Sequence, residues 1–205
     1  GMMYYAPQAW CSDATDAVER IKIQDGTSYG YRPSMWGAHV SAVPNDQVGR
    51  LTSLDTRAAV AYYGAFGYEL DITKMDHDDL ATIKKQVAFY KQYRHLYQFG
   101  TFYRLDNPDT DNDNVYGWQV VNDDQSLAIA TRFQILNGPN PAYIRTYFTG
   151  LDPQKKYTVN SGSEKFSGAE LMNAGYFVPR IMDRTASPKP ASDFSERTFI
   201  IKEVK

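Results

Sequence analysis

Apolar residues up to about residue 105 alternate between short unbroken runs and helical stretches. The segments 3–10, 36–43 and 66–72 are mostly apolar or aromatic, which is typical of strands buried on both faces of a sheet. Each is followed by a stretch with apolar residues at helical spacing or with a high alanine content. This repeated alternation predicts a parallel sheet with crossover helices. Because a closed barrel needs eight such units, we expect the last portion of a larger α/β domain.

Acidic residues mark where two of these helices begin. Asp16 is placed as the N-cap of the first helix, and Glu19 three residues later completes a capping box. The longest helix follows Asp76 and two further acidic residues, which the positive end of the helix dipole favours, and Gly100 is expected to end it. A helix with a weaker cap is expected at 55–65. The apolar stripe of the longest helix is expected at Leu80, Ile83, Val87 and Tyr90.

Beyond residue 105 the pattern changes to short β-rich runs separated by Asn, Asp, Gly and Pro. We expect strands at 115–121, 127–136, 143–148, 157–159 and 198–204, and turns at 122–125, 137–140 and 151–153. Several short strands without a long helix predict an antiparallel β-sandwich. The Pro- and Ser-rich stretch 186–193 is expected to be an exposed loop. The predicted fold class is therefore α/β plus all-β, with domains at 1–105 and 106–205.

Composition and charge narrow the classes of partner. The net charge is -2 and no block of Lys and Arg occurs, which argues against nucleic acid as a partner. No apolar run is long enough to cross a bilayer, and we expect neither a membrane partner nor a signal peptide. The single cysteine excludes an internal disulfide and fits a reducing cytoplasm. Tyr is abundant, with 16 residues, which suits either sugar stacking or antiparallel sheets.

Metal binding is not expected from the His and Asp residues. His39, His77 and His95 lack the spacing of metal ligands: His39 is expected to be a hydrogen-bonded core or rim residue, and the other two to be solvated. The acidic residues of 106–113 alternate as calcium ligands can, but the central Gly and terminal Glu of an EF-hand loop are not in place. We therefore expect a solvated connector there.

Several segments in order resemble the C-terminal region of glycoside hydrolase family 36 α-galactosidases, the melibiase-like enzymes. They are YAPQAWCSDATDAVERIKIQDGTS, GAHVSAVPN, VAYYGAFGYELDIT, KKQVAFYKQYRHLYQFGTFYRL and FSGAELMNAG. The resemblance runs from about Tyr4 to the end of the chain. It implies the last three βα units of a (β/α)8 barrel, followed by a C-terminal antiparallel β-sandwich domain.

The resemblance also implies a reaction and its residues. Family members hydrolyse terminal α-linked galactose from sugars such as melibiose and raffinose, with retention and without a cofactor. Retention needs two carboxyl groups about 5 Å apart, one as nucleophile and one as acid/base. The family motif resembles W-[CT]-S-D-[DN]-T-D, and its first Asp aligns with Asp13, just after an expected strand, where barrel active sites lie. Trp10 and Cys11 lie beside that position and are expected to bind substrate.

Other interpretations of these residues stay open. Trp10 is either part of a sugar platform or a core residue at the strand end. Asp16 is an alternative acid/base but is better explained as a helix cap. Ala14 departs from the family, which usually has Asp or Asn there, and this puts full activity in doubt. Cys11 has no His near it in the sequence and is not expected to be a nucleophile.

The second carboxylate is not found. The family nucleophile lies in a segment resembling K-W-D-[MF]-N, and no such segment occurs. We therefore expect the isolated chain to be inactive on α-galactosides, and to self-associate or bind a complementary N-terminal barrel segment that covers its exposed strand edges. The alternative is a non-catalytic carbohydrate-binding or structural module. An enzyme acting on α-N-acetylgalactosaminides, or transferring galactose between sugars, is also compatible with the residues.

Overall fold

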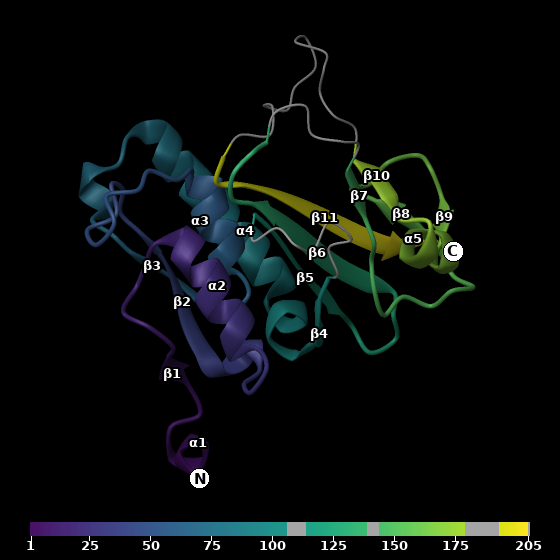
Figure 1. Cartoon of the computed structure of the whole chain (residues 1–205), viewed down its shortest axis with the longest axis horizontal. Helices are drawn as coiled ribbons and strands as arrows, with labels where there is room; N and C mark the ends of the chain where they lie inside the picture. The colour runs from purple at the N-terminus through teal and green to yellow at the C-terminus, as the bar shows by residue number, and fades with distance from the viewer. Residues whose placement is uncertain (106–113, 139–143, 179–192, 205) are drawn as a thin grey trace. The chain divides into compact units, whose positions relative to one another are not determined.

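The computed structural model describes residues 1–105, 114–138, 144–178 and 193–204. The chain divides into two units, Gly1–Gly100 and Thr101–Lys205, with different architectures (Figure 1). The first combines helices with parallel strands, and the second consists mainly of antiparallel strands. This confirms the mixed fold class that the hydrophobic pattern predicts.

A three-stranded parallel sheet in the order β1-β2-β3 organises the first unit. Helices connect its strands, because a parallel pair needs a long crossover. The strands are β1 (Ala9–Trp10), β2 (Trp36–Ser41) and β3 (Ala65–Glu69). The helices are α1 (Met2–Tyr5), α2 (Ala17–Thr27), α3 (Leu54–Ala61) and α4 (His77–Phe99), with 3-10 turns at Pro33–Met35 and Ile72–Lys74.

One face of this sheet packs into the core beneath the helices. Trp36, Ala38 and Val40 alternate along β2 and are at most 2% exposed. Gly64, just after α3, passes close over this face: a Cβ there would lie 2.7 Å from the side chains of Trp36 and Ala38. The Tyr90 hydroxyl of α4 donates a hydrogen bond of 3.0 Å to the Gly64 carbonyl. Close backbone approach and a satisfied carbonyl therefore hold the helices against β2.

The buried face of α4 differs from the predicted stripe. Of the predicted positions, Tyr90 is buried but Leu80 is 41% exposed. The residues that are buried lie mostly in the C-terminal half: Gln86, Tyr90, Tyr93, Leu96 and Tyr97. The helix has 23 residues and is about 34 Å long at 1.5 Å per residue, whereas β2 has 6 residues and spans about 20 Å. The N-terminal turns of the helix therefore extend past the strands and lie exposed.

The expected strand at 3–10 is wrong over most of its length. Residues Met2–Tyr5 form a short helix, and only Ala9–Trp10 pair with β2. Pro7 has no backbone N–H to donate to a ladder, and the preceding tyrosines, Tyr4 and Tyr5, are at least 85% exposed. Apolar character alone did not make a strand where no neighbouring strand is available.

Helix caps largely follow the sequence. The Asp16 carboxylate accepts a hydrogen bond from the backbone N–H three residues later, so the predicted N-cap is confirmed. The Asp76 carboxylate caps α4 in the same way, a role that the sequence analysis did not assign to it. The capping box at Asp16 is not formed, because the Glu19 carboxylate lies instead 3.5 Å from the Arg50 guanidinium. Ser53 caps α3, which begins and ends earlier than predicted. Gly100 follows the last residue of α4, as expected.

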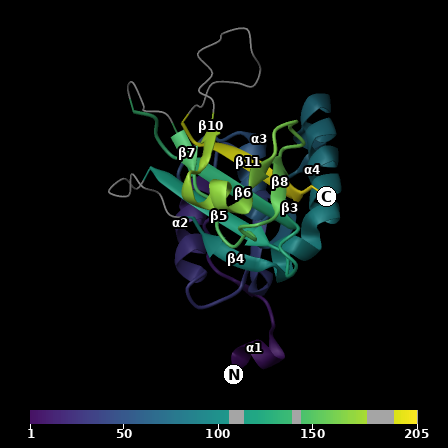
Figure 2. The same cartoon turned by 90° about the vertical axis from the view of Figure 1, so that its right-hand side faces the viewer.

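A six-stranded antiparallel sheet in the order β4-β5-β6-β11-β8-β9 dominates the second unit (Figure 2). A separate two-stranded ribbon pairs β7 with β10, and one short helix, α5 (Gly168–Asn173), follows β9. The strands are β4 (Thr101–Arg104), β5 (Val115–Val121), β6 (Leu127–Gln134), β7 (Ile144–Thr146), β8 (Lys156–Val159), β9 (Phe166–Ser167), β10 (Tyr176–Val178) and β11 (Ser195–Glu203).

All five strands predicted beyond residue 105 are present, within a few residues of their expected bounds. The sequence analysis missed β4, β9, β10 and α5, which are only 4, 2, 3 and 6 residues long. The acidic stretch 106–113, part of the turn 137–140 and nearly all of the loop 186–193 lie outside the described residues.

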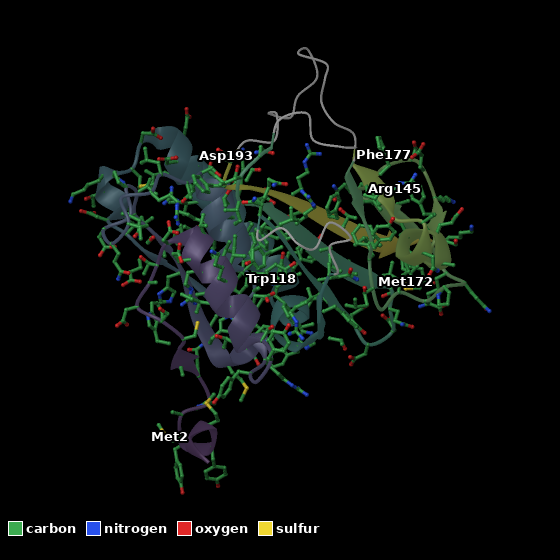
Figure 3. All side chains as sticks on the ribbon, in the orientation of Figure 1. Met2, Trp118, Arg145, Met172, Phe177 and Asp193 are labelled. Carbon is green, nitrogen blue, oxygen red and sulfur yellow. The ribbon has the colours of Figure 1, made fainter. Side chains whose placement is uncertain are left out.

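One hydrophobic cluster of the second unit lies on one face of its sheet. Ala128, Ala130, Phe199 and Ile201 alternate on β6 and β11, and their small and large side chains meet Phe148, Leu151 and Leu171 from the other elements. Figure 3 shows how densely side chains fill this unit, with Met172 labelled at the edge of the core. Gly168 begins α5 at a tight point: a Cβ there would lie 2.0 Å from the Asp152 carbonyl oxygen.

We expect Gly168→Ala to lower the free energy of unfolding of the second unit by about 1–3 kcal/mol, because the new methyl group clashes with a backbone carbonyl that cannot rotate away. Gly26→Ala in α2 is the control, since nothing lies within 4 Å of its Cβ position; it should stabilise by about 0.5–1 kcal/mol. Urea unfolding measures both. Equal effects of the two substitutions would contradict this packing.

Candidate functional site

The residues predicted to act on substrate follow β1. Asp13 is exposed, and only its backbone carbonyl is engaged, by the Gln47 side-chain amide at 3.2 Å. Within the described part of the chain, its carboxylate has no hydrogen-bond or ion-pair partner. Cys11 is half-buried and Trp10 is 39% exposed. The structure thus brings the three predicted site residues together on one short loop.

Asp16, the alternative acid/base, lies in a different environment. It is 3% exposed, and its Oδ2 accepts hydrogen bonds from the Glu19 backbone N–H (3.0 Å) and from the Arg50 guanidinium. The Arg50 charge also lies near the Glu19 carboxylate. A buried carboxylate that accepts from a cation and from a helix N-terminus is engaged within the protein rather than open to a substrate. The geometry therefore favours a structural role for Asp16.

The end of β2 and the loop after it form hydrogen bonds with the Asp13 loop. Asn45, which is 4% exposed, donates to the Thr15 hydroxyl at 3.1 Å and accepts from the backbone N–H groups of Gln47 and Val48. The Ser41 hydroxyl donates to the Thr15 carbonyl at 3.1 Å. Sequence analysis did not identify Asn45 or Gln47, because their role depends on two loops that meet only in the folded chain.

Trp10 lies over the face of the sheet opposite the buried core. Its ring covers Gly37, where a Cβ would lie 2.7 Å from the indole, and it lies 4.3 Å from the His39 ring. His39 Nδ1 is 3.5 Å from the Glu69 carboxylate and makes no hydrogen bond within the described residues. The expected hydrogen bond of His39 is therefore not formed at Nδ1. Aromatic, imidazole and carboxylate groups share this face, which is a composition that suits a sugar.

An open apolar hollow of about 430 Å³ lies beside the edge strand β1. Its lining includes Met3, Trp10, Cys11, Met35 and Trp36. Two of the predicted site residues, Trp10 and Cys11, thus line this hollow. Met2, labelled in Figure 3, also lines it and is 82% exposed.

The described ranges of the chain contain no group of three or more His, Cys, Asp and Glu side chains placed to hold a metal ion. None of the helices in them is both long and apolar enough to span a bilayer. His77 and His95 are exposed on α4, as predicted.

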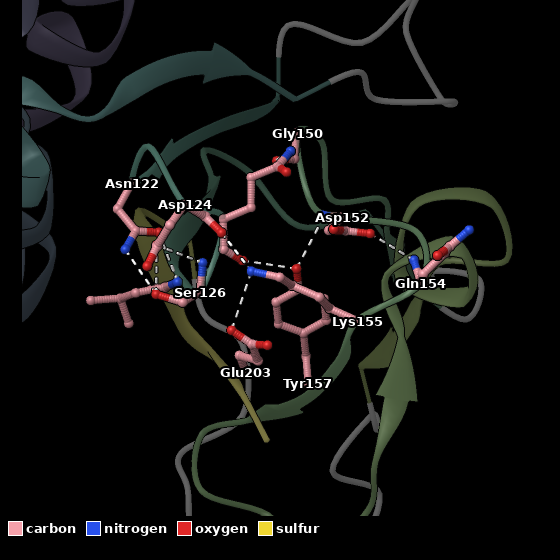
Figure 4. Close-up of polar contacts among 11 residues, drawn as sticks. Asn122, Asp124, Ser126, Gly150, Asp152, Gln154, Lys155, Tyr157 and Glu203 are labelled. Atoms are coloured by element: carbon pink, nitrogen blue, oxygen red, sulfur yellow. Dashed lines mark hydrogen bonds and ion pairs between the residues drawn. The ribbon is translucent and has the colours of Figure 1, made fainter. Parts of the chain in front are cut away.

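The second unit contains a cluster of polar side chains around Lys155 and Tyr157, which contact one another and the backbone (Figure 4). Lys155 Nζ donates to the Asp124 carbonyl at 2.6 Å and pairs with Glu203 at 3.3 Å. The Tyr157 hydroxyl donates to the Gln125 carbonyl and accepts from the Asp152 N–H. Burial raises the pKa of Tyr157, so it stays a neutral donor at physiological pH. These contacts join the 122–126 turn to the loop before β8, and they engage the polar groups within the protein.

Two family models together match most of the chain. The Melibiase model matches residues 1–100, and the glycosyl hydrolase family 36 C-terminal domain matches residues 115–201. The chain belongs to glycoside hydrolase family 36. The resemblance of the quoted segments is thereby confirmed, and the Asp13 loop lies in the part that matches Melibiase.

Curated and solved relatives in family 36 agree with this assignment. The α-galactosidase AgaA of Geobacillus stearothermophilus is 47% identical over 205 residues, covering 100% of this chain and 26% of AgaA. The crystal structure of the Lactobacillus brevis α-galactosidase superposes with a TM-score of 0.93 at 58% identity, over 100% of this chain and 27% of that one. An AgaA variant solved in complex with raffinose gives 0.89 at 46% identity. The chain spans about a quarter of the length of these relatives.

Stability should separate Asp13 from Asp16. We expect Asp13→Ala to change the free energy of unfolding by less than about 0.5 kcal/mol, because an exposed and unpartnered side chain is lost. Asp16→Ala should destabilise by about 2–4 kcal/mol, since it removes a helix cap and the buried carboxylate that accepts from the Arg50 guanidinium. Chemical denaturation of both variants tests this. A large loss for Asp13→Ala would mean that its carboxylate has a structural role.

Proposed function

We propose that this chain supplies the acid/base of a retaining α-galactosidase that hydrolyses terminal α-galactosyl residues of sugars such as melibiose and raffinose. The observation that carries the proposal is the contrast between the two aspartates of the WCSDATD motif. Asp13 is exposed beside Trp10, whereas Asp16 is buried and engaged as a cap. The α-galactosidase relatives, one of them solved with raffinose, support the substrate class.

In this proposal the first unit is the last three βα units of a (β/α)8 barrel, and the second is a C-terminal β-sandwich. A parallel sheet with β1 at one edge supports the first assignment, and a six-stranded antiparallel sheet with an accompanying ribbon supports the second. Active sites of such barrels lie at the C-terminal ends of the strands. Asp13 follows the C-terminal end of β1 by three residues.

The proposed reaction assigns each side chain one task. The Asp13 carboxyl donates its proton to the glycosidic oxygen while a nucleophilic carboxylate, on a segment outside these residues, attacks the anomeric carbon. Asp13 then removes a proton from the water that hydrolyses the glycosyl-enzyme. The Trp10 ring offers an apolar face to the sugar, and Cys11 contacts the substrate from beside it. Ala14 can contribute no hydrogen bond from its side chain.

A fusion enzyme provides the direct test. The matching region of the Lactobacillus brevis α-galactosidase is replaced by this chain, and hydrolysis of melibiose is measured. We expect an active fusion, and a loss of about 10²–10⁴-fold in kcat/KM on Asp13→Ala, because one general acid/base is removed. Asp16→Asn, which keeps a capping oxygen, is the control and should lose far less. Full activity of the Asp13→Ala fusion would refute the assignment.

The 205-residue polypeptide alone should be inactive on α-galactosides, since double displacement needs two carboxylates. We further expect it to self-associate or to bind a complementary N-terminal barrel segment. The apolar hollow beside the edge strand β1, lined by Met35 and Trp36, supports this expectation. Sedimentation velocity and an activity assay address both points. A chain that stays monomeric and also does not bind an added N-terminal barrel segment would contradict the expectation of association.

The non-catalytic alternative has less support. In the second unit the most extensive polar cluster is engaged in its own contacts, as at Lys155 and Tyr157. A carbohydrate-binding module would need free polar groups beside exposed aromatic rings. A cytoplasmic location, for which the single cysteine is the support, is part of the proposal.

A further inference from the structure

Arg20 is an unusual residue for the interior of the first unit. It lies on α2, and only 4% of it is exposed. Among the described residues no carboxylate pairs with its guanidinium, and burial lowers its pKa. A buried cation without an anionic partner is costly unless hydrogen bonds satisfy it. The hydrogen bonds that hold Arg20 in place therefore indicate what the residue is for.

Neutral acceptors from separate elements surround the guanidinium. Nη1 donates to the Ser12 carbonyl at 3.2 Å, and Nη2 donates to the Gly37 carbonyl of β2. Nε and Nη2 both donate to the Gln24 side chain one turn along α2, at 3.3 and 3.2 Å. The Gln24 amide in turn donates to the Val60 carbonyl of α3 at 3.0 Å. Arg20 thus connects the loop after β1 to the rigid part of the unit.

In the loop after β1, Arg20 contacts the residues that directly precede Asp13 in the sequence. The guanidinium carbon lies 5.8 Å from the centre of the Trp10 ring, within the range of a cation–π contact. The Cys11 side chain lies close enough to the guanidinium to offset part of the lowering of its pKa by burial. The Ser12 carbonyl belongs to the peptide bond that joins Ser12 to Asp13. One buried side chain therefore sets the orientation of three consecutive residues before the exposed carboxylate.

We propose that Arg20 is a positioning residue, which holds the Trp10 ring and the Ser12 carbonyl so that the Asp13 carboxyl meets the glycosidic oxygen. This inference rests on the proposed function of Asp13. Only arginine fits the task, because its planar fork sends several donors in different directions at once. Lysine keeps the charge, but its three donors share one nitrogen atom, so they cannot reach the separate acceptors on Ser12, Gly37 and Gln24 that Nη1, Nη2 and Nε reach.

The first test measures the loop without any catalysis. Hydrogen exchange of the 205-residue chain is followed by mass spectrometry on the peptide that covers residues 9–16. In Arg20→Lys we expect exchange in this peptide to accelerate by about tenfold or more, because the loop opens locally. Arg57→Lys is the matched control: Arg57 is also buried, on α3, and donates to the Ser41 and Ser53 carbonyls rather than to this loop. Unchanged exchange at 9–16 in Arg20→Lys would overturn the inference, whatever the activity.

The second test uses the fusion enzyme and two substrates that differ in leaving group. The glucose leaving group of melibiose needs a proton from the acid, whereas the 2,4-dinitrophenolate of 2,4-dinitrophenyl α-galactoside leaves without one. For both substrates kcat/KM reports the step in which the leaving group departs. For Arg20→Lys we expect kcat/KM to fall about 10–100-fold on melibiose and less than about 3-fold on the aryl substrate. Arg57→Lys should keep the parent ratio of the two values. An equal fall on both substrates would mean that Arg20 serves stability only.

Failure of this inference is distinguishable from failure of the proposed function. If Asp13→Ala in the fusion keeps its activity on melibiose, the assignment of Asp13 is wrong. If Asp13→Ala discriminates between the two substrates but Arg20→Lys does not, Asp13 is the acid and Arg20 does not position it.

Discussion

The ion pair between the buried Asp16 and the half-buried Arg50 is the contact on which the geometry of the Asp13 loop depends. Asp16 ends the loop after β1, caps α2 and meets a cation from the loop after β2. These constraints fix where α2 begins and how it faces the sheet. They also fix the direction in which Arg20, one turn later, sends its guanidinium. Asp13 lies between Ser12, whose carbonyl accepts from Arg20, and Asp16, which pairs with Arg50, so the loop is held in place while Asp13 stays exposed.

Much of this arrangement can be predicted from local sequence signals. The cap at Asp16 could be predicted because capping involves groups only three residues apart. Strand lengths and buried faces were less accessible, because they depend on neighbours far along the chain. Residues 3–10 are apolar, yet only Ala9–Trp10 found a pairing partner in β2. The burial of Arg20 had no local signal, since charged residues on helices usually face solvent.

The candidate site was predicted by a different route. Physical chemistry placed Asp13 after a strand and favoured a helix cap for Asp16, and the family motif assigned Asp13 as the acid/base. The structure adds a physical reason for it, because one carboxylate is engaged and the other is free to meet a ligand. The supporting residues Asn45, Gln47 and Arg20 emerged only from the folded geometry, in which two loops and a helix converge.

Azide chemistry gives the sharpest measurement of the role of Asp13. In the Asp13→Ala fusion, azide can replace the water that the acid/base would have activated. If Asp13 is the acid/base, azide attacks the glycosyl-enzyme, and the product identified by nuclear magnetic resonance is α-galactosyl azide, with retained configuration. If Asp13 is instead the nucleophile, no glycosyl-enzyme forms and azide attacks the substrate directly. The β-galactosyl azide that results would contradict the account.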